Sequence, residues 1–326
     1  LGGDETATIV VQLKTVTPIL GGGYRTRKLD DVDIIRVPTI RGHLRFWWRA
    51  LYAHEDKGAK ELYQDECKLW GGAGGEDDGA GKSQVELRIK NIKMLIATKE
   101  GYVDNSKVHT YSSRKFKETV GSYALWVAQE PHADRYKKGI AFELYVRTPI
   151  EHLKQVRNAL KAWILFGGYG SRTRRGLGSL TVKKEDQDQW LPKAATKKAI
   201  NGLFEGLDPL GKEVGEEDKF KGDTPRLQGA LLYVGDSENK DGKKAWEEAL
   251  NKLKDFRQGP GFARKNYEGP NNRDQYDTRR PGRSFWPEPD CIRRLWINKK
   301  YKWAHDPIYK GNITWPRADF GLPIGV

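Results

Sequence analysis

One stretch, Phe166 to Ser179, limits the possible folds of this chain more than any other. Its letters, FGGYGSRTRRGLGS, contain five glycines, one tyrosine and three arginines, between a helix-patterned run and a short strand-patterned run. Glycine lets a backbone adopt positive φ and approach a ligand closely, and arginine offers phosphate a planar, permanently charged fork. Because Leu153 to Lys184 contains no Asp or Glu, the stretch predicts a loop that holds a polyanion. A solvated turn is the simpler alternative.

The spacing of glycines in this loop excludes two common nucleotide-binding motifs. A Walker loop needs a Lys followed by Ser or Thr after its last glycine, and no glycine here is followed by that pair. A dinucleotide fingerprint starting at Gly168 would need a third glycine where Thr173 stands. That fingerprint also opens a helix after a strand, whereas this loop closes a helix pattern and leads into a strand pattern.

The periodicity of the first half of the chain predicts an α+β domain. Apolar and polar residues alternate in four runs, which is typical of strands. In two other runs the apolar residues recur at the i, i+3, i+4 spacing of a helix face. Thr148 and Pro149 supply a cap and a first-turn proline for the second helix, which ends at Gly167. The order βαββαβ is that of a ferredoxin-like fold, the layout of RNA-recognition domains. The expected elements are strands Thr6–Val16, Val85–Ile96, Ile140–Arg147 and Ser179–Val182, a helix over Val37–Tyr52 and a helix ending at Gly167.

The first predicted helix carries a stripe of arginines. Arg41, Arg45 and Arg49 recur every four residues, beside an apolar face that includes Trp47 and Trp48. We expect the tryptophans to be core rather than platforms for bases. No carboxylate lies between Asp33 and Glu55, so nothing local in the sequence neutralises the three cations. The stripe therefore predicts contact with an anionic partner, and Phe46, which points away from the apolar face, is a candidate for base stacking.

Charge and cysteine content narrow the class of protein. The formal net charge is +14, with 11 tryptophans and 14 tyrosines, a combination that suits nucleic acid. Only Cys67 and Cys291 occur, without a C-x-x-C motif, which argues against a zinc site or a disulfide scaffold and favours a reducing cytoplasm. No apolar run is long enough for a membrane span.

Composition also predicts the domain organisation. We expect a first domain over residues 1–190, a charged linker region over 191–225 and a second domain over 226–326. The second domain is expected to begin with a strand over Leu227–Val234 and a helix over Lys243–Phe256. Few regular elements follow them, so we expect this domain to be irregular, or incomplete at the C-terminus.

The sequence contains weak candidates for catalysis. Among six histidines, His43 is best placed for a general base, at the start of the arginine-striped helix. A lone histidine on a helix is more often a hydrogen-bonded surface residue or a packing residue than a catalytic base. The cluster Asp30, Asp31 and Asp33 has metal-capable oxygens, but a solvated loop is the expected explanation. We therefore expect no catalytic residue, no metal and no cofactor.

Four blocks of sequence resemble a known family. FGGYGSRTRRGLGS, after the second helix of a ferredoxin-like unit, is similar to the signature loop of the RAMP superfamily of CRISPR proteins. PTIRGHLRFWWR, GRSFWPEPDCIRRLW and PRADFGLPIGV, in that order, resemble a narrower group, the first-numbered subunits of the type III-B Cmr effector complex. This resemblance implies two ferredoxin-like RAMP domains. Such subunits usually continue past the last block, which is where this chain ends.

The resemblance implies a role in antiviral defence. Such a subunit binds guide (CRISPR) RNA towards its 3′ end and helps capture target RNA, alongside the other Cmr subunits and away from membranes. The cleavage residues of that family belong to other subunits, so no active site is implied here. Some RAMP relatives are metal-independent endoribonucleases that process guide precursors, which keeps open an alternative with His43 as general base. The expected RNA-binding residues are Arg41, Arg45, Phe46, Arg49, Gly168, Tyr169, Gly170, Arg172, Arg174 and Arg175.

Overall fold

The computed structural model falls into two compact units, one of residues 1–106 and 130–243 and one of residues 107–129 and 244–326. The first unit holds the main sheet and the candidate site. The second holds most of helix α7 (Gly242–Gln258) and the short strand pair β7 (Tyr267–Glu268) and β8 (Ile308–Tyr309). The structure describes residues 5–20, 33–53, 58–72, 81–94, 124, 135–136, 139–210, 226–228, 230, 232, 242–258, 267–268 and 308–309.

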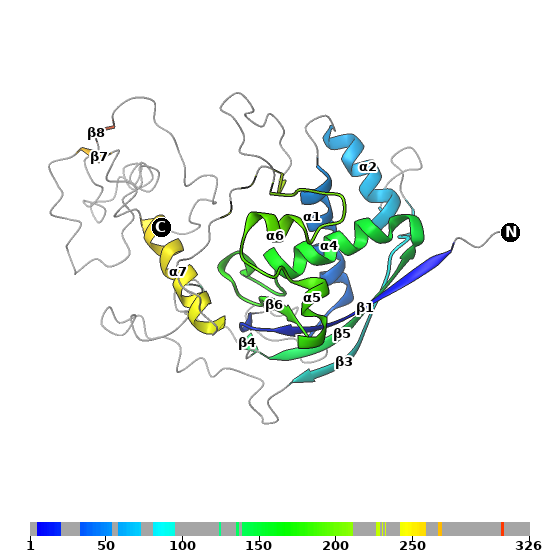
Figure 1. The fold of residues 1–326 in the computed structure, drawn as a ribbon, viewed down its shortest axis with the longest axis horizontal. Helices are drawn as coiled ribbons and strands as arrows, with labels where there is room; N and C mark the ends of the chain where they lie inside the picture. Colours follow the sequence, from blue (N-terminus) through cyan, green and yellow to red (C-terminus); the bar gives the residue numbers. More distant parts are fainter. Residues whose placement is uncertain are drawn as a thin grey trace, which may run out of the picture. The chain divides into compact units, whose positions relative to one another are not determined.

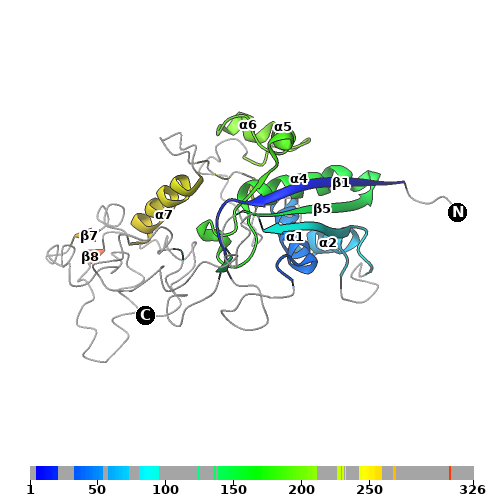
Figure 2. The same cartoon turned by 90° about the horizontal axis from the view of Figure 1, so that it is seen from below.

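A four-stranded antiparallel sheet forms the base of the first unit (Figures 1 and 2). Its strand order is β3-β5-β1-β6, so the first and third long strands are central. This order and the sequence of elements are those of the predicted ferredoxin-like fold. The strands are β1 (Thr6–Thr15), β3 (Glu86–Met94), β5 (Ile140–Pro149) and β6 (Leu180–Val182). Each overlaps its predicted range, and no end differs from the predicted one by more than two residues.

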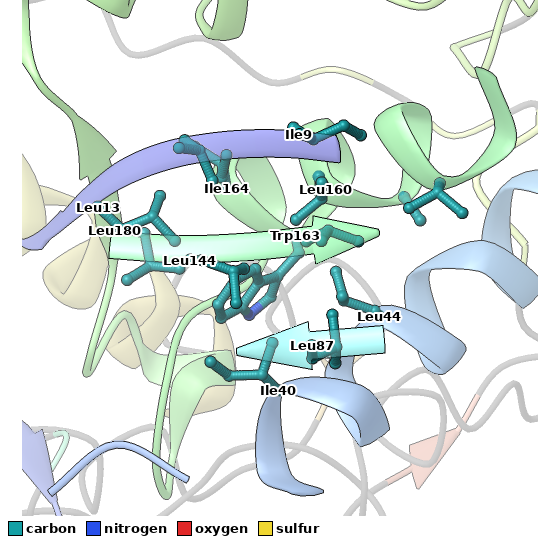
Figure 3. Packing of buried hydrophobic residues seen from close by; sticks show 14 of the residues in the cluster. Ile9, Leu13, Ile40, Leu44, Leu87, Leu144, Leu160, Trp163, Ile164 and Leu180 are labelled. Carbon is teal, nitrogen blue, oxygen red and sulfur yellow. The ribbon is translucent and has the colours of Figure 1, made fainter. Parts of the chain in front are cut away.

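Three helices cover one face of this sheet (Figure 1). The predicted helices are confirmed as α1 (Val37–Tyr52) and α4 (Leu153–Phe166), with a 3₁₀ turn over Ile150–His152 before α4. The third, α2 (Ala59–Trp70), was not predicted, because its apolar positions are interrupted by charged residues. The inward side chains of the strands pack against α1 and α4, as Figure 3 shows for Leu13 and Leu144 of the sheet and Trp163 of α4. Alternation in the strands and helical spacing therefore built the expected core.

The part of the expected linker that the structure describes belongs to the packed first unit. Helix α6 (Lys197–Asn201) lies in this region, and α5 (Gln187–Trp190) ends just before it. Ile200, Phe204 and Leu210 form an apolar cluster with side chains of α1 and α4. Leu227 joins this cluster and donates its backbone N–H to the carbonyl of Ala50 at 2.8 Å, and residue 227 is not in a strand. Scattered apolar residues among the charges are thus enough to dock residues 200–210, and the domain boundaries stay a prediction.

A polar cluster holds this segment against α4. The Glu205 carboxylate accepts hydrogen bonds from Arg157 at 3.0 Å and from Lys161 at 3.4 Å. The side-chain amide of Asn158 is fully buried; it donates to the backbone carbonyl of Glu205 and accepts from the backbone N–H of Glu205. Burial raises the pKa of Glu205, but the hydrogen bond and charge of Arg157 and the charge of Lys161 outweigh burial, so its pKa lies below the ordinary value.

Expectations for the second unit are tested only in part. A helix was predicted over Lys243–Phe256 and is present as α7. The block GRSFWPEPD and the C-terminal block lie outside the described residues, so a second RAMP domain stays a prediction. No described helix is long and apolar enough to cross a membrane.

The docking of residues 197–210 is expected to depend on acid pH. Because the folded-state pKa of Glu205 is lowered, its carboxylate adds stability above the unfolded-state pKa, about 4.3. That stability is lost as the pH falls through the folded-state pKa. The protection factors of residues 197–210 against hydrogen exchange, taken relative to the intrinsic rate at each pH, should therefore fall at acid pH in the wild type, and Glu205→Gln should lower them already at neutral pH. Glu185→Gln, which changes an exposed carboxylate, is the matched control; equal exchange in Glu205→Gln and wild type at neutral pH would refute the role of this cluster.

Candidate nucleic-acid interface

The glycine-rich loop after α4 is closed by backbone hydrogen bonds. Tyr169 N–H donates to the carbonyl of Gly178 at 2.9 Å, which joins the two sides of the loop. Gly178 N–H donates to the carbonyl of Pro18 at 2.8 Å, and Ser171 N–H to that of Leu20 at 2.9 Å. The loop is thus pinned to the segment that follows β1, including the short strand β2 (Ile19–Leu20), which pairs with β4 (Arg135–Tyr136).

Two hydroxyl groups complete this attachment. Thr17 Oγ1 donates to the carbonyl of Gly176 at 2.6 Å and accepts from Ser179 N–H at 2.8 Å. Ser179 Oγ donates to the same Gly176 carbonyl at 3.0 Å. These bonds satisfy backbone groups that a loop would otherwise leave to water. The solvated-turn alternative therefore does not describe this loop, because its base is a hydrogen-bonded structural unit.

Two glycines have backbone conformations that the closure requires. Gly178 has φ +66°, and a Cβ there would overlap the carbonyl oxygen of Tyr169. Gly170 has φ +94°, and its Cβ would lie 2.9 Å from Ile19 Cγ2. Both positions combine the left-handed region with a close backbone approach, which only glycine tolerates well. Glycine at these positions was expected to let the backbone approach a ligand; in the structure it allows the contact between the loop and the β1–β2 segment.

Gly168 and Tyr169, predicted to bind RNA, are part of the packed base of the loop. The Gly168 carbonyl accepts from the indole N–H of Trp163 at 2.9 Å. Tyr169 is only 4% exposed, and its hydroxyl accepts from the backbone N–H of Arg36 at 2.8 Å. A ring buried in this way does not offer a face to a base. The loop tyrosine thus joins α4 to the start of α1.

The tip of the loop carries the three arginines. Arg172 adopts a left-handed conformation, with φ 60°, and a 3₁₀ turn over Thr173–Arg175 follows. The Arg174 side chain is exposed, whereas Arg172 and Arg175 are half-buried. Arg174 makes no ion pair within the described residues. The tip therefore presents an exposed guanidinium on a constrained backbone, and its contact with phosphate stays a prediction.

The arginine stripe of α1 lies against a carboxylate. Glu66 of α2 is fully buried and accepts from Arg45 Nε at 2.5 Å and from Arg49 Nη1 at 2.6 Å. Arg41 donates to Ser83 Oγ at 2.5 Å and to the carbonyl of Val85 at 3.1 Å. The inference that nothing local neutralises the stripe is therefore wrong. It considered only neighbours in sequence, and Glu66 comes from a helix that was not predicted.

The stripe and the loop lie on different sides of α1. Arg45 and Arg49 contact α2, and Arg41 contacts the start of β3. His43, about 200° around the helix from Arg41, faces α4 and the loop. The stripe contacts α2 and the start of β3, whereas the loop contacts the segment that follows β1 and the start of α1. These contacts give no support to a single groove formed by both sets of arginines.

The aromatic residues of α1 separate into core and surface. Trp48 is buried, and its indole N–H donates to Gln155 Oε1 at 2.9 Å, while Trp47 is partly buried against Phe166. Their prediction as core residues is confirmed for Trp48 and holds in part for Trp47. Phe46 is 43% exposed, as expected, with its ring edge-on to Trp47 at 5.2 Å. Its stacking on a base stays a prediction.

His43 is wedged between two aromatic rings. It stacks on Trp163 at 6.0 Å between ring centroids and meets Tyr169 edge-on at 6.2 Å. Burial lowers the pKa of His43, so the imidazole is neutral at physiological pH. Its Nε2 atom is buried and has no hydrogen-bond partner in the described part of the chain. This geometry is that of a packing residue between α1 and the loop.

The described residues contain no group of three His, Cys, Asp or Glu side chains able to hold a metal ion. Of the acidic cluster considered above, only Asp33 is described. The cations, backbone groups and aromatic rings of the site suit binding of a polyanion.

Removal of the Glu66 charge should loosen the packing of α1 on α2. Glu66→Gln leaves two partly exposed arginines without their shared carboxylate, and hydrogen bonds to charged groups contribute about 1.5–3 kcal/mol each. We expect the free energy of unfolding in urea to fall by about that amount. Asp65→Asn, on the same helix, breaks an exposed pair with Lys68 and should cost about 0–1 kcal/mol. If both variants lose the same small amount of unfolding free energy, the pairing of Glu66 with Arg45 and Arg49 does not stabilise the fold.

Comparisons with known proteins identify the family. A search of curated protein sequences found no match. Among solved structures, the chain is similar to apo Cmr1 from Pyrococcus furiosus, with a TM-score of 0.45 and 17% identity over 77% of this chain and 72% of that chain. It is also similar to a chain of the type III-B Cmr-β complex bound to cognate target RNA, with a TM-score of 0.39 and 15% identity over 62% of this chain and 63% of that chain. A second structure of that complex, with target RNA, AMPPnP and ssDNA, matches at the same TM-score and identity over 72% of this chain and 66% of that chain.

The sequence model of the RAMP superfamily matches residues 12–181, more than half of the 326 residues, and the chain therefore belongs to the RAMP superfamily.

Proposed function

We propose that this chain is a non-catalytic RNA-binding subunit of a type III-B CRISPR effector complex in the cytoplasm. In this role it contacts guide RNA towards its 3′ end and helps other Cmr subunits capture target RNA. Membership of the RAMP superfamily and the sequence blocks that resemble Cmr subunits support the assignment. The loop between α4 and β6 is the part of the chain proposed to hold RNA.

The observation that carries this proposal is the construction of the loop. Its base is fixed by bonds to Thr17, Pro18 and Leu20, and its tip presents Arg172, Arg174 and Arg175. A binding group held in place loses less conformational entropy when it meets its ligand. Arginine guanidiniums suit phosphate oxygens, and the backbone of RNA offers them at every nucleotide. A constrained, acid-free loop with a cationic tip is therefore suited to a sugar-phosphate strand.

We divide the proposed RNA-binding residues into three groups. Gly170, Arg172, Arg174 and Arg175 form the primary contact at the loop tip. The α1 residues Arg41, Arg45, Phe46 and Arg49 form a secondary surface, in which Arg45 and Arg49 both form ion pairs with Glu66. We assign Gly168 and Tyr169 the task of positioning the tip.

The salt dependence of RNA binding tests the primary contact. Each single-strand phosphate neutralised contributes about −0.7 to the slope of log K against log salt. Arg174→Ala should therefore flatten the slope by about 0.7, and Arg174→Ala with Arg175→Ala by about 1.4. The measurement is a titration of a single-stranded RNA at several salt concentrations, with Lys60→Ala on α2 as a control that leaves the slope unchanged. An unaltered slope in the double variant would place these side chains off the RNA.

The alternative function is guide-RNA processing with His43 as general base. Neutral imidazole is the form that this chemistry requires, and burial favours it. However, a general base must reach the 2′-hydroxyl, and the buried Nε2 atom of His43 packs against aromatic rings instead. The structure thus gives this alternative less support than RNA binding.

A cleavage assay separates the two functions. Guide precursor incubated with the wild-type chain in chelator is expected to stay intact, and His43→Ala should behave identically. His43→Gln, which keeps a polar side chain of similar reach, is the control for loss of packing. Cutting by the wild type that disappears in both variants, while their folding is unchanged, would replace the binding proposal with the enzymatic one.

A further inference from the structure

The sheet of the first unit has a second face that none of its described helices covers. Helices α1, α2 and α4 all lie on the opposite side (Figure 1). Alternation along the strands sends every second side chain away from them, and these side chains are exposed or half-buried. We call this set the outer face; its members are Thr8, Val10, Gln12 and Lys14 of β1, Glu86, Arg88, Lys90 and Lys93 of β3, and Glu143, Tyr145 and Arg147 of β5.

The outer face is basic. It carries five exposed cations and two carboxylates. One of these, Glu143, accepts hydrogen bonds from Gln12 at 3.4 Å, Asn91 at 2.7 Å and the Tyr145 hydroxyl at 3.1 Å. Its oxygens are thus engaged within the face, and the surrounding cations dominate the field that a ligand meets. The exposed cations are Lys14, Arg88, Lys90, Lys93 and Arg147.

Tyr145 occupies the centre of this face. Its direct neighbours across the sheet are Val10, 49% exposed, on β1 and Arg88 on β3. The ammonium group of Lys90 lies 4.6 Å from the centroid of its ring, so this face of the ring is covered by an exposed, flexible side chain that a ligand can displace. The hydrogen bond to Glu143 holds the ring in place and, as the main cause, raises the pKa of Tyr145. The side chain therefore stays neutral when an anion approaches.

We propose that the outer face is a second RNA-binding surface, on which an unpaired base stacks on Tyr145 while Lys14, Arg88 and Lys90 contact the flanking phosphates. This inference rests on the proposed RNA-binding function. The base takes the position of the Lys90 ammonium over the ring, and the flexible Lys90 side chain turns to phosphate. Aromatic rings surrounded by cations bind single strands with little preference for sequence, since every base has a π face.

The position of the loop supports a continuous path. Lys14 lies next to β6, opposite Thr181, and only a few residues before Thr17 and Pro18, which bind the loop. Four residues of strand separate Lys14 from Val10, beside Tyr145, a distance of about 13 Å. The loop and the ring thus lie within reach of one short stretch of RNA.

The composition of the outer face favours RNA over a protein partner. Lysine and glutamate are depleted in protein–protein interfaces, whereas this face is largely Lys, Arg and Glu. Double-stranded RNA fits poorly, because its bases are stacked on one another and closed to side chains. A single strand with accessible bases matches both the ring and the charge.

The test compares Tyr145→Ala with Tyr145→Phe in the full chain. The probe is a short fluorescent oligouridylate, titrated with protein and followed by anisotropy. Loss of one stacked base should weaken binding by about 5- to 150-fold in Tyr145→Ala. Tyr145→Phe keeps the ring and should bind like the wild type. Tyr63→Ala, which removes an exposed tyrosine from α2 on the helical side, is the matched control and should not change affinity.

Several outcomes would overturn the proposal. Wild-type affinity in Tyr145→Ala excludes stacking and leaves a protein partner as the occupant of the face. An equal loss in Tyr145→Phe assigns the effect to the hydroxyl network instead. If Tyr145→Ala does not fold, Lys14→Gln with Lys90→Gln replaces it, and the salt slope should flatten by about 1.4 units or the proposal fails. Arg174→Ala, measured in parallel, separates this result from the loop: binding that depends on Arg174 but not on Tyr145 or the lysines refutes only the outer face.

Discussion

The pairing of β1 with strands on both of its sides is the constraint on which the rest of the first unit depends. β1 pairs with β5 along nearly its whole length and with β6 at Leu13 to Thr15. The buried Thr15 hydroxyl also accepts from the backbone N–H groups of Gly139 and Ile140, at 3.1 Å each. This double pairing fixes where the chain emerges after Thr15, and that emerging segment is the one that receives the glycine-rich loop.

The loop therefore gains its shape from the sheet rather than from its own sequence alone. Gly178 and Ser171 bond to Pro18 and Leu20, which are far away in sequence and adjacent only because β1 and β6 pair. Positive φ at Gly170 and Gly178 allows the approach, but the partner carbonyls come from the β1–β2 segment. A loop held at its base in this way can present arginines at its tip with a smaller loss of conformational entropy on binding.

The two arginine clusters of the first unit have different physical roles. Arg45 and Arg49 share the buried carboxylate of Glu66, and together they hold α1 against α2. Arg174 is exposed and constrained by the turn that contains it. Burial of a carboxylate is costly unless it is paired, so Glu66 requires its arginines as much as they require it. Clusters of like charge in a sequence therefore indicate binding only where the fold supplies no buried counter-charge.

The sequence by itself determined the α+β class, the βαββαβ order and the positions of most strands and of both long helices, because alternation and helical spacing are local signals that burial of a single core enforces. It also located the loop, since five glycines and three arginines in one acid-free stretch leave few other roles. Only the tertiary structure decided that Tyr169 is buried, that Glu66 neutralises the α1 stripe and that residues 191–210 pack on the first unit. Each depends on a contact between residues far apart in the chain, such as Arg45 and Glu66, and no local pattern encodes such a partner. The apolar spacing of Leu62, Leu69 and Trp70 was a faint sign of α2, but the buried position of Glu66 follows only from how α2 packs.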